Sequence, residues 1–74
     1  MKYVIADKSL AGDFGFDEYT HRTNKKDIIL NEKEVMSKAS LEGDTLEKKV
    51  EKMNGRVYER AELIQIISEG GWND

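Results

Sequence analysis

The 74-residue chain contains no cysteine, no proline and only one histidine. The absence of cysteine excludes a disulfide, a thiol nucleophile and a zinc–thiolate cluster, and with one histidine we expect no metal ion. No run of 18 apolar residues is present, so the sequence predicts no membrane-spanning helix. The chain is also too short for a barrel enzyme, a doubly wound nucleotide-binding fold or a protein kinase, and we expect no cofactor.

The composition is that of a small globular domain. Apolar residues make up 38% of the chain and charged residues 36%, and the net charge is only −3. This mixture is too hydrophobic and too balanced for a disordered chain, so we expect one domain over residues 1–74. Small domains without disulfides or metals are often stabilised by self-association, which makes a homodimer one expectation. The short apolar run Tyr3–Ala6 is not a secretory signal, which favours a cytoplasmic location.

Three short apolar runs predict strands, near residues 3–6, 27–30 and 56–58. A polar run at 18–23 precedes the second strand across Asn24–Asp27, which has turn-forming residues at both ends. We interpret the polar run as either an edge strand or an irregular loop. A sheet of about three short strands is therefore expected.

A helix signal follows each of these strands, so that a short strand leads three times through a polar cap into a helix. Asp7 is the N-cap of the first such helix, which Gly12 and Gly15 limit to about two turns. The three strand–cap–helix segments resemble one another, but this resemblance does not indicate a repeat protein. Any strand that passes directly into a helix has the same sequence pattern.

Longer helices are expected near residues 31–40, 44–54 and 60–69. Capping boxes begin the first two, with the caps at Asn31 and Asp44. The third is rich in isoleucine, which leaves a strand as the alternative. These elements predict an α+β fold, a small sheet with about three helices packed on it and covering one face.

The junction between the helix at 44–54 and the strand at 56–58 must reverse the chain within three residues. Asn54–Gly55 is compatible with a hairpin turn, but the strong helix before it favours a C-cap. Glycine adopts the left-handed conformation without a Cβ penalty. We therefore predict a positive φ at Gly55.

The segment at 21–26 is the candidate site for binding a negatively charged ligand. Arg22, Lys25 and Lys26 provide three positive charges, which suit a phosphate-bearing ligand or a nucleic acid. His21 precedes them, but a catalytic histidine needs a nucleophile and an orienting partner, and the sequence implies neither. We interpret the segment as a solvated turn, with a phosphate-facing loop as the alternative.

Aromatic residues give two further hypotheses. Trp72 follows two glycines near the end of the sequence, and it either tucks back onto the core, contacts a partner or is disordered. Tyr3 and Tyr58 would form a stacking platform for single-stranded nucleic acid if both faced outward from neighbouring strands.

The function expected is that of a non-enzymatic protein-interaction or regulatory module. Its partner, another protein or a second copy of the chain, would contact the last helix and Trp72. The alternative is binding of a nucleic acid or a phosphate ligand through Arg22, Lys25 and Lys26. No membrane contact is expected, because no predicted helix has a strongly basic polar face.

Overall fold

The structure is a computed structural model that describes residues 1–72, and it confirms the α+β fold. The strands form one antiparallel sheet in the order β2-β1-β3. No helix among residues 1–72 is long and apolar enough to cross a membrane. The elements in chain order are β1 (Lys2–Asp7), α1 (Lys8–Asp13), β2 (Asp27–Asn31), α2 (Glu32–Ser37), α3 (Leu46–Glu51), β3 (Arg56–Glu59) and α4 (Arg60–Ser68).

Each strand passes directly into a helix, and the last residue of each strand is the N-cap of that helix. The Asp7 carboxylate accepts a backbone N–H in the first turn of α1 at 3.0 Å. Asn31 and Glu34 form the predicted capping box, with two hydrogen bonds of 2.8 Å. At the third junction the N–H of Glu59 donates to the Glu62 carboxylate at 3.0 Å. The predicted strand–cap–helix pattern is therefore confirmed at all three junctions.

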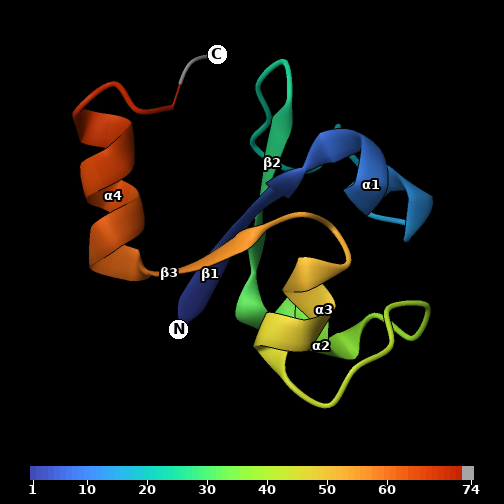
Figure 1. The fold of residues 1–74 in the computed structure, drawn as a ribbon. Helices are drawn as coiled ribbons and strands as arrows, with labels where there is room; N and C mark the ends of the chain where they lie inside the picture. The colour runs from blue at the N-terminus through green and yellow to red at the C-terminus, as the bar shows by residue number, and fades with distance from the viewer. Residues whose placement is uncertain (73–74) are drawn as a thin grey trace.

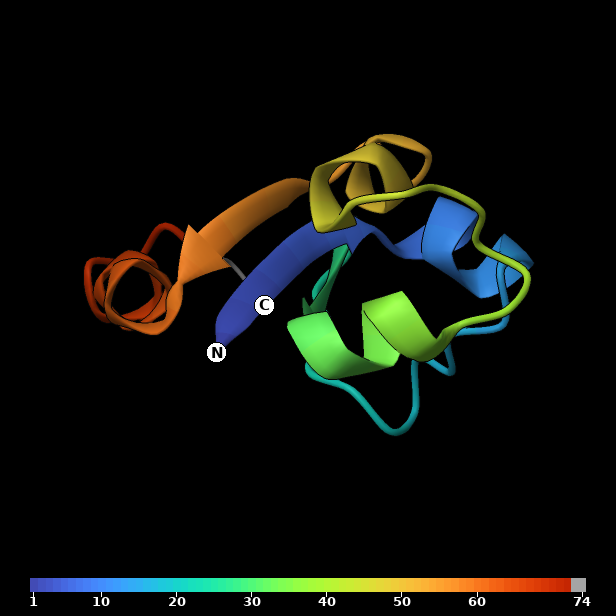
Figure 2. The ribbon, with the colours of Figure 1, turned by 90° about the horizontal axis from the view of Figure 1, so that it is seen from below.

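One face of the sheet carries the core. Val4 pairs with Leu30 on one side and with Val57 on the other, and Ala6 pairs with Ile28. Helices α1, α2 and α3 lie over this face (Figures 1 and 2), and their apolar side chains complete the cluster. The buried members are Val4, Ala6, Ala11, Phe16, Ile28, Leu30, Val35, Leu41, Leu46, Val50 and Met53. We call this side of the sheet the core face.

Helix α4 does not join the other three. It contacts β3 and β1 and lies on the other side of these strands from α1–α3 (Figures 1 and 2). Leu63 is its buried residue, whereas the neighbouring Ile64 is 49% exposed. The expectation that the helices cover one face therefore holds for α1–α3 and is wrong for α4.

Both helices between β2 and β3 are shorter than predicted. Helix α2 ends at Ser37 because the backbone of Lys38 is extended, with φ −76° and ψ 109°. The following turns bring Leu41 into the core, where it is fully buried. Helix α3 is capped by Thr45, which accepts the N–H of Lys48 at 3.2 Å, so the prediction of an Asp44 cap is wrong by one residue.

The prediction of a positive φ at Gly55 is also wrong by one residue, since the left-handed residue is Asn54, with φ 55°. The N–H of Asn54 donates to the Glu51 carbonyl and the N–H of Gly55 to the Val50 carbonyl, both at 3.1 Å. This is a Schellman C-cap with asparagine, which tolerates the left-handed region, at its C′ position. Glycine is required at 55 for space instead, because an added Cβ would lie 2.9 Å from the Ile5 carbonyl oxygen.

The polar run at 18–23 is mostly a loop. Its last two residues pair with β2: Thr23 forms an isolated antiparallel bridge to Ile28, and the Arg22 carbonyl accepts the Ile29 N–H at 3.0 Å. The loop alternative is therefore correct, and the strand character is confined to the last two residues before the turn at Asn24–Asp27.

Candidate functional site

Lys25 and Lys26 lie at the tip of the hairpin that enters β2. The side-chain oxygen of Asn24 accepts the N–H groups of Lys26 and Asp27, at 2.9 and 2.6 Å. Lys8, the first residue of α1, donates from Nζ to the Asn24 carbonyl at 2.9 Å and from its N–H to the Lys26 carbonyl at 2.8 Å. The tip is thus tied to the start of α1, and both lysine side chains are exposed.

The charges around this tip do not form an anion site. Lys25, Lys26 and Lys8 border an open cavity between α1 and the 17–26 loop. Four carboxylates line the same cavity, those of Asp7, Asp13, Asp17 and Glu18. The acids outnumber the lysines, so the local field does not favour phosphate. Arg22 lines a different cavity, and the structure therefore does not bring the three predicted basic residues together.

His21 joins the same loop to α2. Its Nε2 lies 2.8 Å from a carboxylate oxygen of Glu34, and its Nδ1 lies 2.6 Å from the Asp17 carbonyl oxygen. The ring meets the Phe16 ring edge-on, and Lys38 Nζ lies 4.7 Å from the centre of that second ring. The side chain of His21 is only 16% exposed. The interpretation of 21–26 as a solvated turn is therefore wrong for His21.

The two acceptors around the imidazole favour its protonated form. Burial lowers the pKa of His21, but the hydrogen bonds to Glu34 and to the Asp17 carbonyl and the charges of both residues outweigh it. The pKa therefore lies above its ordinary value of 6.5. Thr20 Oγ1 lies 3.2 Å from Nδ1, but Nδ1 uses its proton for the Asp17 carbonyl and is not free to act as a base. The cluster is a structural ion pair.

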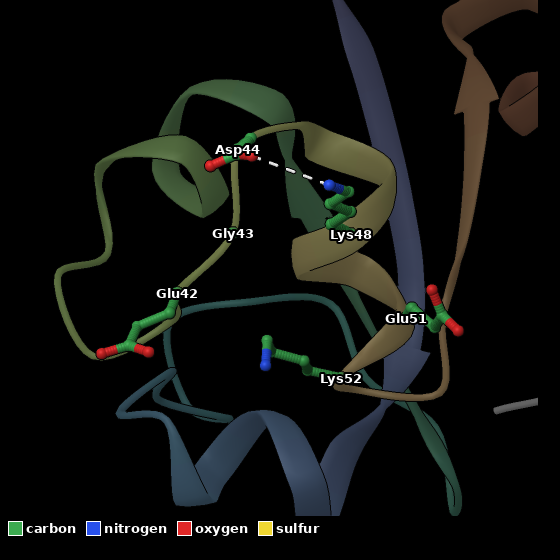
Figure 3. A pocket seen from close by; sticks show the side chains of 6 residues that line it. All are labelled: Glu42, Gly43, Asp44, Lys48, Glu51 and Lys52. Atoms are coloured by element: carbon green, nitrogen blue, oxygen red, sulfur yellow. Dashed lines mark ion pairs between the residues drawn. The ribbon is translucent and has the colours of Figure 1, made fainter.

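A second charged cavity borders α3 and the loop before it (Figure 3). Its lining residues are Glu42, Gly43, Asp44, Lys48, Glu51 and Lys52. Asp44 and Lys48 form an exposed ion pair at 3.6 Å, whereas Glu42 and Glu51 point to opposite sides (Figure 3). The carboxylates do not converge on a common point. Over residues 1–72, no group of three or more metal-ligating side chains is placed to hold a metal ion.

The face of the sheet opposite the core is the third candidate. The register places Tyr3 beside Tyr58 and Ile5 beside Ile29, and the strand period points these side chains away from the core face. All four are partly exposed. Helix α4 lies on this side near β3 and β1, whereas α1–α3 lie on the other (Figure 2). We call these four residues the open face.

An arginine stands at each end of the row that runs through the two isoleucines. Ile5 pairs with Arg56 across β3 and with Ile29 across β2. The Ile29 N–H donates to the Arg22 carbonyl at 3.0 Å, and with the Thr23 bridge this places Arg22 opposite Ile29. The row therefore consists of Arg22 in the loop before β2, Ile29 in β2, Ile5 in β1 and Arg56 in β3.

Both arginine side chains at the ends of the row are exposed. Arg22 also lines a shallow cavity of about 300 Å³ together with Tyr3 and Ile29, which confirms its position beside the open face. Within the described part of the chain, the ion pairs involve neither Arg22 nor Arg56. Asp7 and Asp27 form the next row along the strands, and Asp7 is engaged there as the cap of α1.

Trp72 is tucked back rather than exposed, with 7% of its surface accessible. It and Leu63 are buried outside the main core cluster. The segment after α4 turns back toward the sheet (Figure 1). The Trp72 Nε1 is buried and has no hydrogen-bond partner among residues 1–72. Burial removes Trp72 as an exposed contact and leaves the sheet as the candidate surface.

Sequence reasoning did not select Ile5, Ile29 or Arg56 as site residues. The runs at 3–6 and 27–30 are apolar throughout, so they show no alternation that would separate a buried face from an exposed one. The one available signal was the possible outward pairing of Tyr3 with Tyr58, which the register shows.

Comparisons of the chain with family models, with curated proteins and with solved structures gave no match.

Proposed function

We propose that this protein is a non-enzymatic protein-interaction module that binds its partner on the open face. The observation that carries the proposal is the pairing of two tyrosines and two isoleucines on a partly exposed face, with an arginine at each end of one row that makes no ion pair within residues 1–72. Tyrosine and arginine are enriched at the energetic centres of protein interfaces. The partner is another protein or a second copy of the chain.

Single-stranded nucleic acid is the second candidate, because Tyr3 and Tyr58 meet the geometric condition for a stacking platform. Two observations favour a protein instead. Asp7 and Asp27 lie on the same face, and the chain carries a net charge of −3. Nucleic-acid binding depends on the release of counterions by a positively charged surface, and this driving force is weak here.

The role is proposed as non-enzymatic because the only histidine is committed to an ion pair. Both ring nitrogens of His21 face acceptors, which leaves no free imidazole to act as a base. We propose a cytoplasmic location as part of this function.

The proposal is tested by NMR titration of the isotope-labelled chain with an uncharged, strand-forming peptide. The probe is a blocked heptapeptide, Thr-Gln-Thr-Ile-Thr-Gln-Thr, at millimolar concentration. The amide signals of Tyr3, Ile5, Ile29 and Tyr58 are expected to shift with the peptide. Ile29→Thr should weaken binding several-fold, because it removes apolar area from the open face. Ile64→Thr makes the same change on exposed α4 and should leave binding unchanged.

Two parallel measurements complete the test. A short oligothymidine at low salt is expected to leave the spectrum unchanged, and tight binding of it on the open face would replace the proposal with the nucleic-acid alternative. Sedimentation velocity at increasing protein concentration detects a second copy as the partner. If neither the peptide nor self-association involves the open face, the proposal is wrong.

A further inference from the structure

The row Arg22, Ile29, Ile5, Arg56 places two positive charges at the ends of an apolar strip. From it we infer that the partner's docking segment is an extended chain in which two carboxylates flank an apolar side chain at intervals of two residues. This inference rests on the proposed function and names the chemistry of the partner at the same face.

The spacing of the row decides between an extended segment and a helix. Three strand-to-strand steps of about 4.8 Å separate the arginine backbones by about 14 Å. In an extended chain, residues four apart are separated by about 13 Å and point to the same side, with the residue between them pointing to that side too. In a helix the same distance needs about nine residues, which places the two side chains on opposite sides. Only the extended segment presents both carboxylates and the apolar residue together.

The charges around the row support two carboxylates at its ends. Neither Arg22 nor Arg56 makes an ion pair among residues 1–72, so each guanidinium is available for a bidentate contact. Glu34, which lines the cavity beside Arg22, is already engaged by His21. Asp7 and Asp27 lie two residues along the strands and disfavour a carboxylate in their own row. Of these neighbouring rows, the one that ends in arginine therefore favours a partner's carboxylates, whereas the acidic row disfavours them.

The test compares three blocked heptapeptides in NMR titrations of the full chain at low salt. They are Thr-Glu-Thr-Ile-Thr-Glu-Thr, its Gln counterpart and its Lys counterpart. Two exposed ion pairs are each worth a modest amount, so the Glu peptide should bind about 3- to 10-fold more tightly than the Gln peptide. The Lys peptide should bind more weakly than either. High salt should remove the preference, because exposed charges are screened.

Two double variants locate the preference. Arg22→Ala with Arg56→Ala should bind the Glu and Gln peptides equally. Lys25→Ala with Lys26→Ala removes the same charge from the hairpin tip, and it should retain the preference. A preference lost in the lysine variant and kept in the arginine variant would overturn the inference, because the carboxylates would then be recognised at the tip.

The outcomes separate this inference from the proposed function. Equal binding of the Glu and Gln peptides at the open face would overturn the inference and leave the interaction module intact. Failure of all three peptides to bind would count against both. Tighter binding of the Glu peptide, lost only in the arginine variant, supports both.

Discussion

The two faces of the sheet are built from neighbouring residues of the same strands but differ in burial. Ile28 is fully buried among the helices that cover the core face, whereas Ile29, the next residue in β2, is partly exposed on the open face. Three helices cover the first face and one helix lies on the side of the second. Stability is therefore concentrated on one side of a single sheet, and the other side retains partly exposed apolar side chains.

The coverage differs because of how the helices are connected. Helices α2 and α3 follow one another between β2 and β3, so both are available to the same face of the sheet. Helix α4 begins directly after β3, which is an edge strand of the sheet, and it contacts β3 and β1. One helix, about 10 Å wide, does not span three strands.

The strongest test of this difference is a matched pair of truncations in β2. Ile28→Ala should lower the free energy of unfolding by about 3 kcal/mol, since it leaves a cavity in a closed core. Ile29→Ala should cost about 1 kcal/mol or less, because solvent and side chains can fill the space. Urea melts measure both. The total free energy of unfolding of a domain of this size is about 4–8 kcal/mol, so Ile28→Ala can prevent folding. In that case Ile28→Val, which should lower the free energy of unfolding by about 1 kcal/mol, replaces it.

Equal losses for the two alanine variants would break the comparison. They would show that another molecule buries Ile29 in solution. If that molecule is a second copy of the chain, dilution should dissociate the dimer and expose Ile29.

A second test probes how tightly the core side is packed. Gly55→Ala should destabilise the fold by about 2 kcal/mol, because the new Cβ would lie 2.9 Å from the Ile5 carbonyl oxygen and 3.0 Å from Val50 Cγ1. Gly12→Ala is the matched control, with nothing within 4 Å of the added Cβ. It lies in α1 and should stabilise the protein by up to about 1 kcal/mol. A neutral Gly55→Ala in thermal or urea melts would contradict the close approach of β3 to β1.

The helix end beside Gly55 gives a smaller effect. Asn54→Ala should cost about 1 kcal/mol, because alanine at φ 55° is strained. Asn54→Gly should cost nothing or stabilise slightly, since glycine takes this conformation freely. Urea melts of the two variants, compared with each other, isolate the backbone effect. A larger loss for the glycine variant would contradict the Schellman cap.

The smallest effect is expected at the rim, where the His21–Glu34 pair joins the loop to α2. The folded-state pKa of His21 is raised, so its stabilising contribution is complete below the unfolded value near 6.5 and is lost as pH rises through the folded value. We expect the stability difference between the protein and its His21→Gln variant to shrink by about 0.5–1 kcal/mol over that window. Urea melts at several pH values measure it, and a pH-independent difference would show that the pair contributes no charge interaction.

Local structure was largely predictable from the sequence. Asn31 and Glu34 predict their capping box, and Asp7 predicts its helix, because these hydrogen bonds form within four residues. The errors at Asp44 and Gly55 are single-residue shifts between neighbours that satisfy the same local rule. The end of α2 could not be predicted, because Leu41, four residues after the helix, is buried in the core by contacts with residues distant in the sequence.

The candidate site depended on tertiary structure. Arg22 and Arg56 are 34 positions apart in the sequence and become the two ends of one row only when β1 pairs with both of its neighbours. The sequence by itself determined the α+β class, the three strand–cap–helix junctions and the absence of disulfides. Strand register decided which isoleucine is buried and which is exposed, because a shift of one residue exchanges the two faces of a strand. The direction in which α4 leaves the sheet then decided that one face remains open.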